Sequence, residues 1–331
     1  MNDPFVLASA VGEDGVCSAL AWSVLQGADQ PSTGAFGCSE DDLFDLASLT
    51  KPLATVTTLA LLVDEGCLRL DQRVGHWLPE AQGALAQATL ADLLHHRAGL
   101  LAFSEQLAVG LSGEADQRLR GLRFRALELP LKHRPGTVVY SDLGFILLAW
   151  ICQRAGRSVD ALTQHDALGG FWAPGQGEQP SLTRFVPSGR DEAGQPLLGR
   201  VHDPTCRLVG GRDCGHAGWF GSLTMTTRAV RAWLDLAAGR PTPLPAAARA
   251  FIEVAPGQRS AGFDVPTVGG TTGGGWSAQS FGHLGYTGTA FWVDPAADRA
   301  AVLLTNRTWP DDSDRGIADL RRRFFGAVAR L

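Results

Sequence analysis

Runs of residues that favour β-strands lie at the two ends of this chain, and helical patterns fill the middle. Residues 16–28 (VCSALAWSVLQGA) predict a strand, and residues 289–307 (TAFWVDPAADRAAVLLTNR) predict two strands joined at an Asp-Pro turn. A sheet built from both termini must accommodate the intervening helices as an insertion. We therefore expect one α+β domain over residues 1–331, with an α/β part at about 1–70 and 230–331 and a helical subdomain at about 71–229.

Two helical patterns in the first third of the chain carry their own end signals. The pattern FDLASLTKPLATVTTLALLVDEG predicts a helix from near Ser48 to Gly66, a glycine in the position that commonly follows a helix. The shorter pattern ATLADLLHH begins after Thr89, a candidate N-cap, and we expect it to end near Gly99. The first helix is nearly free of charge, so a lysine near its start needs an explanation.

Three more helices are expected further along. Residues 141–156 (SDLGFILLAWICQRAG) are apolar on almost every side, which predicts a buried helix. Amphipathic helices are expected at 225–239 and at the closing residues 318–331. The segments 157–215 and 255–285 are rich in glycine and polar residues, so we expect them to be irregular.

Charge and composition narrow the classes of function. The 331 residues carry a net charge of −5 and no dense block of lysine and arginine, so a nucleic-acid partner is not expected. No apolar run reaches the length of a membrane span. Residues 1–15 lack the basic start of a signal peptide, which favours a cytoplasmic protein. The six cysteines have no zinc spacing and no Walker A pattern occurs, so we expect free thiols, no metal and no cofactor.

Ser48 and Lys51 form the first candidate catalytic pair. Residues three apart are neighbours on a helix face, so the Lys51 amine can approach the Ser48 hydroxyl. Burial lowers a lysine pKa from about 10.4 toward neutrality, and a neutral Lys51 could act as a base. The alternative is coincidence, because this spacing is common, although the chain has only two lysines, Lys51 and Lys132.

Two further motifs lie downstream. Tyr140 precedes the buried helix, and a phenol near a lysine ammonium would have a lowered pKa and could shuttle protons. The alternative is a packing tyrosine, with Asp142 as the helix N-cap. His283 and Gly285 head the predicted hairpin, where glycine lets a ligand come close. A structural histidine in a turn is the alternative there.

Together these motifs resemble the serine β-lactamase and penicillin-binding-protein superfamily, in its class C β-lactamase and esterase branch. That family has SxxK, then Tyr-x-Asn, then Lys/His-x-Gly near the C-terminus, in the order found here. The sequence around these motifs resembles that of the family too, as in FDLASLTKPLAT, LADLLHHRAGL, PGTVVYSDLGF and FGHLGYTGTAFWVDP. The resemblance covers most of the chain and implies a mainly antiparallel sheet flanked by helices, with the site in the cleft beside a helical subdomain.

The resemblance also implies roles for individual residues. Ser48 would be the acylated nucleophile, Lys51 would hold it and relay its proton, and Tyr140 would be the base. The backbone N–H groups of Ser48 and Tyr286 would form the oxyanion hole. His283 would line the strand edge of the pocket.

Two departures from the family pattern bear on the substrate. Asp142 stands where the β-lactamases carry asparagine, and an ionised carboxylate repels anions and cannot donate a hydrogen bond. His283 stands where the antibiotic-hydrolysing members have lysine, which removes a positive charge that pairs with a substrate carboxylate. We therefore expect a carboxylesterase whose partner is a small neutral ester or amide.

Other functions stay open at this point. They are a D-amino-acid peptidase or amidase, a β-lactamase, an acyltransferase, and a non-catalytic member of the fold that binds a ligand. His202, Asp203 and His216 are candidates for lining the pocket, but their roles and the oligomeric state are not assigned. The adjacent His95 and His96 would point about 100° apart on a helix, so we interpret them as structural.

Overall fold

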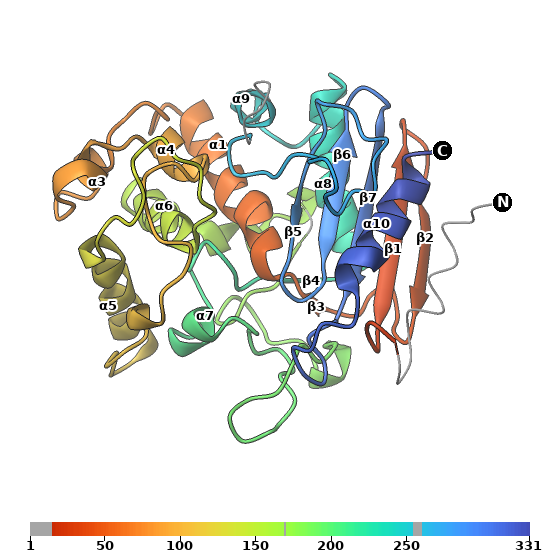
Figure 1. Ribbon diagram of the computed structural model, residues 1–331, viewed down its shortest axis with the longest axis horizontal. Coiled ribbons are helices and arrows are strands. Elements are labelled where there is room, and N and C mark those ends of the chain that lie inside the picture. The colour runs from red at the N-terminus through yellow and green to blue at the C-terminus, as the bar shows by residue number, and fades with distance from the viewer. Residues whose placement is uncertain (1–14, 169, 254–259) are drawn as a thin grey trace.

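The computed structural model describes residues 15–168, 170–253 and 260–331. Its largest element is a five-stranded sheet with the order β2-β1-β7-β6-β5, in which every neighbouring pair is antiparallel. The strands are β1 (Leu20–Gln26), β2 (Ser32–Phe36), β5 (Phe281–Leu284), β6 (Ala290–Asp294) and β7 (Arg299–Thr305). β1 pairs with β7 along its whole length, so strands from both ends of the chain meet in the middle of the sheet, as expected (Figure 1).

β2 and β5 are strands that the sequence analysis did not predict. Each contains a glycine beneath a tryptophan of the neighbouring strand. A Cβ atom on Gly34 would lie 2.6 Å from Trp22 Nε1, and one on Gly282 would lie 2.8 Å from the Trp292 ring. Glycine weakens the strand signal in a sequence, but here it makes room for a large cross-strand partner. The expectation that 255–285 is irregular is therefore wrong at its end, where β5 adds a third strand to the predicted hairpin.

Helices cover both faces of this sheet (Figure 1). They are α8 (Leu223–Ala237) on one face and α10 (Ile317–Val328) on the other. Alternate residues of β1 face them: Ala21 joins the core cluster that includes Trp233 of α8, whereas Trp22 joins the cluster that includes Phe324 of α10. Because neither face is open to water, every residue of β1 except Gln26 is buried.

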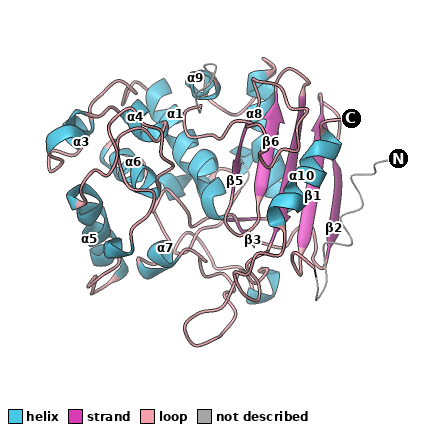
Figure 2. Cartoon of the chain, in the orientation of Figure 1, coloured by secondary structure: helices cyan, strands magenta, loops and turns pink. Residues whose placement is uncertain are grey.

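Most of the other helices gather to one side of the sheet (Figure 2). The helices besides α8 and α10 are α1 (Thr57–Asp64), α2 (Val74–Trp77), α3 (Gly83–Gln87), α4 (Leu90–Leu94), α5 (Ala115–Glu128), α6 (Asp142–Arg154), α7 (Pro204–Leu208) and α9 (Arg249–Ile252). A small second sheet pairs β3 (Phe44–Asp45) with β4 (Phe220–Gly221). The division into an α/β part and a helical subdomain at about 71–229 stays a prediction. Among the described residues, no helix combines the length and apolar character needed to cross a membrane.

The expected helices are present, with one end corrected. The patterns at 141–156, 225–239 and 318–331 correspond to α6, α8 and α10. Gly66 follows α1 with φ +70°, a left-handed conformation that glycine adopts without strain. Thr89 caps α4 through a capping box. α4 ends at Leu94 rather than near Gly99, because His96 has φ +56° and cannot continue the helix. The described residues of the segment 157–215 are irregular apart from α7 and short 3₁₀ helices.

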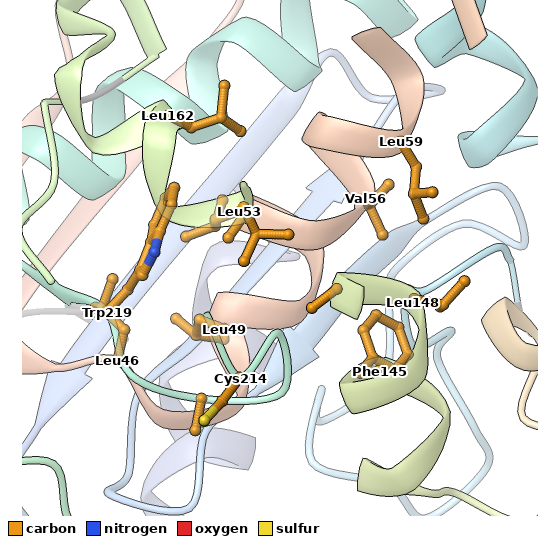
Figure 3. Close-up of a cluster of buried hydrophobic side chains, with 14 of the residues drawn as sticks. Leu46, Leu49, Leu53, Val56, Leu59, Phe145, Leu148, Leu162, Cys214 and Trp219 are labelled. Carbon is orange, nitrogen blue, oxygen red and sulfur yellow. The ribbon is translucent and has the colours of Figure 1, made fainter. Parts of the chain in front are cut away.

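One continuous helical segment carries the candidate pair Ser48 and Lys51. It begins as a 3₁₀ turn (Ala47–Leu49), passes through a π-helical stretch (Lys51–Val56) and continues as α1. Figure 3 shows its apolar side chains between two groups, with Phe145 and Leu148 of α6 on one side and Leu162 and Trp219 on the other. The helical side chains labelled there are Leu49, Leu53, Val56 and Leu59. All of these residues belong to one buried core, which holds the start of the helix in place.

Candidate active site

Ser48 lies in a tight turn at the start of this central helix. The residue before it, Ala47, has φ +47°, a left-handed backbone conformation that is strained for alanine. Asp45, buried at the end of β3, holds that conformation, because its Oδ1 accepts a hydrogen bond from Ala47 N at 2.8 Å. The first N–H groups of a helix have no acceptor within the helix. The turn can therefore offer both the hydroxyl and the N–H of Ser48 to a ligand.

Lys51 is fully buried, and its amine faces three oxygen atoms. Lys51 Nζ lies 3.0 Å from Ser48 Oγ, 3.1 Å from the His216 carbonyl oxygen and 2.6 Å from Asp142 Oδ1. A carboxylate at 2.6 Å stabilises a cation but not a neutral amine. The geometry therefore favours the charged form of Lys51.

This arrangement corrects the prediction that Lys51 has a pKa near neutrality. Burial by itself lowers the pKa of Lys51, as expected. The Asp142 carboxylate and the Tyr140 oxygen raise it, however, and the net shift of the pKa is upward. Lys51 is thus an ammonium group at neutral pH, and it donates a hydrogen bond to Ser48 Oγ.

Tyr140 stands within hydrogen-bonding reach of both Ser48 and Lys51. Lys51 Nζ also lies 4.9 Å from the centre of the Tyr140 ring. Burial raises the pKa of Tyr140 and outweighs the lowering by the Lys51 ammonium, so the predicted downward shift is wrong. At neutral pH Tyr140 is a neutral phenol that can accept a hydrogen bond at its oxygen and donate another.

His96 packs against the ring of Tyr140. Its Nδ1 accepts a hydrogen bond from Ser141 N at 3.0 Å, and its ring centre lies 4.7 Å from that of Tyr140. Asp142, the first residue of α6, follows directly, and Ser141 occupies the N-cap position that the alternative interpretation gave to Asp142. His96 therefore contacts Tyr140, and no spacing in the sequence pointed to that contact.

The turn between β5 and β6 is tied to the chain just before Ser48. Thr289 Oγ1 donates a hydrogen bond to the Leu46 carbonyl oxygen at 3.1 Å. Gly285 permits this approach, because a Cβ atom there would lie 2.8 Å from the same oxygen and 2.0 Å from Thr289 Oγ1. Tyr286 directly follows Gly285. Because of this contact, Tyr286 and Ser48 line the same two cavities.

Two cavities meet at Ser48, and Tyr140 and Tyr286 line both of them. The smaller one, with a volume of about 330 Å³, has walls that include the polar residues Asp264, His283, Arg307 and Arg321. The larger one, with a volume of about 460 Å³, has walls that include Phe103, Asp142, His202, Asp203, His216 and Asp312. The predicted site residues from all parts of the chain therefore surround one region, although their catalytic roles stay predictions.

The smaller cavity contains two arginines that the sequence analysis missed. Arg321 of α10 is buried and donates a hydrogen bond to the Gly285 carbonyl oxygen at 2.7 Å. Arg307 follows β7, and its guanidinium carbon lies 4.2 Å from the ring centre of Tyr286. His283, on β5, is buried with its ring centre 5.9 Å from that of Tyr140. Both arginines come from the C-terminal end of the chain, and their spacing gave no sign of proximity to Ser48.

The larger cavity contains the three polar residues whose roles the sequence did not assign. His216 Nε2 lies 3.2 Å from Asp203 Oδ1, and both side chains are largely buried. His202 Nε2 lies 3.2 Å from Asp312 Oδ1, and the His202 ring stacks on that of Tyr286. The motifs that contain these residues were visible in the sequence, but only the folded structure shows that they lie near Lys51.

Comparison with known proteins adds to this geometry. The family described as Beta-lactamase matches residues 7–324. A protein of Escherichia coli (strain K12) named "Putative D-alanyl-D-alanine carboxypeptidase" is 25% identical, with 80% of this chain and 69% of the relative covered. The structure of "EstCE1, a hydrolase with promiscuous acyltransferase activity" has a TM-score of 0.70 at 20% identity, covering 95% of each chain. A class C beta lactamase from Rhodobacter sphaeroides has a TM-score of 0.67 at 21% identity, covering 92% of this chain and 93% of the other. At these identities the structural likeness establishes the fold, which is that of the serine β-lactamases.

Proposed function

This chain belongs to the Beta-lactamase family, and on that premise we propose that it is a serine hydrolase that forms an acyl-enzyme on Ser48 and acts mainly on small neutral esters. The family and the structural neighbours are hydrolases of the serine β-lactamase fold. The observation that carries the proposal is the convergence of three polar groups beside one cavity. They are the Ser48 hydroxyl, the Lys51 ammonium and the Tyr140 phenol.

Acylation follows from the hydrogen bonds around Ser48. The Lys51 ammonium donates to Ser48 Oγ, so the hydroxyl proton of Ser48 points elsewhere, and the Tyr140 oxygen lies within its reach. As Ser48 Oγ bonds to the ester carbonyl carbon, Tyr140 accepts this proton and passes its own phenolic proton to the departing alkoxide. The Lys51 ammonium stabilises the negative charge that develops on Ser48 Oγ as the hydroxyl proton leaves.

Deacylation uses the same groups in reverse. Tyr140 takes a proton from a water molecule whose oxygen attacks the acyl carbon, and Ser48 Oγ receives a proton as its ester bond breaks. In both steps the backbone N–H groups of Ser48 and Tyr286 would stabilise the oxyanion. The N–H of Ser48 suits this role because it lies in the first turn of the central helix.

The charges that a substrate meets in the larger cavity support a neutral substrate. The Asp142 and Asp203 side chains are 20% and 21% exposed, whereas those of their cationic partners Lys51 and His216 are 0% and 3% exposed. A ligand therefore contacts the carboxylates, with the cations buried behind them. An anionic group is repelled from this cavity, which favours uncharged esters and amides.

A second candidate function is favoured by the smaller cavity. Arg307 and Arg321 both line it, and guanidinium groups bind carboxylates with paired hydrogen bonds. Arg321 Nη2 donates to the backbone oxygens of Gly285 and Thr289, which leaves its positive charge without neutralisation by those contacts. A substrate with a free carboxylate fits this cavity. That substrate would make the chain a D-amino-acid peptidase or amidase, or a β-lactamase.

Fluorophosphonate labelling tests the nucleophile. We expect the wild-type chain to be labelled at Ser48 between about pH 6 and pH 9, with the site identified by peptide mass spectrometry. Ser48→Ala should abolish labelling and turnover, and Ser112→Ala, at an exposed serine, should change neither. A folded wild-type chain that is never labelled would contradict the proposal and favour a member of the fold that only binds a ligand.

A substrate panel separates the two candidate functions. The first predicts a higher kcat/KM for p-nitrophenyl butyrate than for nitrocefin or for a peptide ending in D-Ala-D-Ala. The second predicts the opposite order, together with a large loss of kcat/KM for the carboxylate substrates in Arg321→Met. Arg322→Met, at an exposed position on the same helix, is the matched control and should have no effect.

A further inference from the structure

The Asp203–His216 pair takes no part in the reaction steps above, although both residues line the larger cavity. We propose that this buried ion pair positions Lys51 through the carbonyl oxygen of His216, and that the hold weakens when His216 loses its charge at alkaline pH. Asp203 and His216 are then positioning residues that act through Lys51. The inference rests on the proposed role of Lys51, but its test does not require turnover.

The hydrogen bonds of His216 identify it as an imidazolium. Nε2 lies 3.2 Å from Asp203 Oδ1, and Nδ1 lies 3.3 Å from the Cys214 carbonyl oxygen. Both partners are acceptors, so each ring nitrogen must carry a proton to make its bond. Asp203 is fixed in turn, because the same Oδ1 accepts a hydrogen bond from Cys206 N at 2.7 Å and caps α7.

The ion pair reaches Lys51 through a single residue. The carbonyl oxygen that accepts from Lys51 Nζ at 3.1 Å belongs to His216 itself. The adjacent Gly215 carbonyl oxygen accepts from Thr55 Oγ1, one turn further along the central helix, at 2.7 Å. A Cβ atom on Gly215 would lie 2.5 Å from the Phe145 carbonyl oxygen, so the segment is also packed closely against α6. The imidazolium therefore anchors a short segment that has little room to move in any other direction.

Four charged groups from four elements face one another here. They are Asp203 at α7, His216 on the segment after it, Lys51 on the central helix and Asp142 on α6. The Cys214 thiol also faces His216. Burial lowers the pKa of His216, but Asp203 and then Asp142 raise it to about 9. Above that pH a neutral imidazole can donate to only one of its two acceptors, whereas Lys51 keeps its charge through Asp142.

Because the chain has only two lysines, NMR of labelled lysine can follow the environment of Lys51 directly. With ¹³C-labelled lysine, only Lys51 and Lys132 give side-chain signals, and Lys132→Arg assigns them. The wild-type Lys51 signal should shift with a midpoint near pH 9, following His216. In Asp203→Asn, which keeps an oxygen for Cys206 N, burial should hold His216 neutral, so this shift should move below about pH 6.5.

Kinetics of the same variants supply the second readout. Asp203→Asn and His216→Asn should each lower kcat about tenfold near neutral pH with little change in KM, and the double variant should be no worse than either single one. Asp203→Asn should recover on acidification, as His216 regains its proton, which a purely structural defect would not do. Asp92→Asn removes a partly buried ion pair with Arg97 at a helix N-terminus and should leave both readouts unchanged.

The outcomes separate this inference from the proposed function. A Lys51 signal that stays the same in folded Asp203→Asn and does not move near pH 9 in the wild type would overturn the inference, whatever the activity. If Asp203→Asn does not fold, His216→Asn gives the same NMR test, because it keeps the carbonyl oxygen and removes the imidazolium. A wild-type chain whose Lys51 signal follows His216 but whose Ser48 is never labelled would support the positioning and overturn only the proposed function.

Discussion

Lys51 Nζ and Asp142 Oδ1 lie 2.6 Å apart, in a site where Lys51 has no exposed surface. The two residues come from different helices that the apolar core packs together (Figure 3). In that dry setting the carboxylate decides the charge of the amine, because a buried lysine without a partner tends to lose its proton. In the proposed reaction, Lys51 is therefore the hydrogen-bond donor and Tyr140 is the proton acceptor.

Asp142→Asn should lower the pKa of Lys51. The variant keeps the burial that favours the neutral amine and removes the carboxylate that opposes it. In a titration from about pH 6 to pH 10, the ¹³C signal of Lys51 should then change at a lower pH than in the wild type, and the alkaline limb of kcat should also move to lower pH. Asp92→Asn is the control. A Lys51 signal that remains that of an ammonium group throughout this range would refute the role given to Asp142.

Lys51→Met should lower kcat/KM by about 10³-fold or more, because it removes the ammonium that stabilises the charge developing on Ser48 Oγ. It should also destabilise the fold by about 3–5 kcal/mol, since it leaves the Asp142 carboxylate without its buried partner. The double variant Lys51→Met/Asp142→Asn should recover most of this stability and none of the activity. Lys132→Met, at an exposed lysine, should change neither quantity. Recovery of activity in the double variant would show that Lys51 acts only on stability.

Stability should fall as the pH rises from about 6.5 to above 9. The pKa of His216 is about 9 in the folded chain, above its unfolded value of about 6.5. The folded state therefore holds this proton more tightly, and the contribution is complete below about pH 6.5 and lost as the pH passes 9. Asp203, with a pKa of about 2, keeps its own contribution throughout this range.

Urea unfolding at a series of pH values measures this effect. The free energy of unfolding of the wild type should fall by a few kcal/mol across the window. His216→Asn should be less stable at pH 6.5 and should show a much smaller decline. Equal slopes for the wild type and the variant would mean that other groups cause the decline.

Gly285→Ala should lower both stability and activity. Its Cβ atom would lie 2.0 Å from Thr289 Oγ1 and 2.8 Å from the Leu46 carbonyl oxygen, so the turn that carries Tyr286 must move. We expect a loss of about 1–3 kcal/mol, as for other overpacking substitutions, and slower labelling of Ser48. Gly144→Ala, where the nearest atom is 3.4 Å away, is the control and should be neutral or stabilising. If Gly285→Ala is destabilised but its Ser48 is labelled at the normal rate, the turn that carries Tyr286 does not position an oxyanion-hole N–H group.

Local patterns in the sequence were enough to predict the helices and strands whose formation depends on short-range periodicity and end signals. The strand at 16–28, the hairpin at 289–307 and the helix that starts near Ser48 follow from side-chain periodicity and end signals, which act within a few residues. The same holds for the spacing of Ser48 and Lys51. β2 and β5 were missed because their glycines are explained only by a tryptophan on the neighbouring strand.

The sequence by itself determined which chemical groups the chain possesses and, through short-range periodicity, most of the elements that carry them. Tertiary structure alone decided their charge states and partners. Lys51 is an ammonium group because α6 brings Asp142 to it, and Tyr140 stays a neutral phenol because its burial raises its pKa more than the nearby ammonium lowers it. His216 gains its charge from Asp203 in the same way. A pKa depends on solvent exclusion and on distances of a few ångströms, and neither exists until segments that are remote in the sequence have packed together.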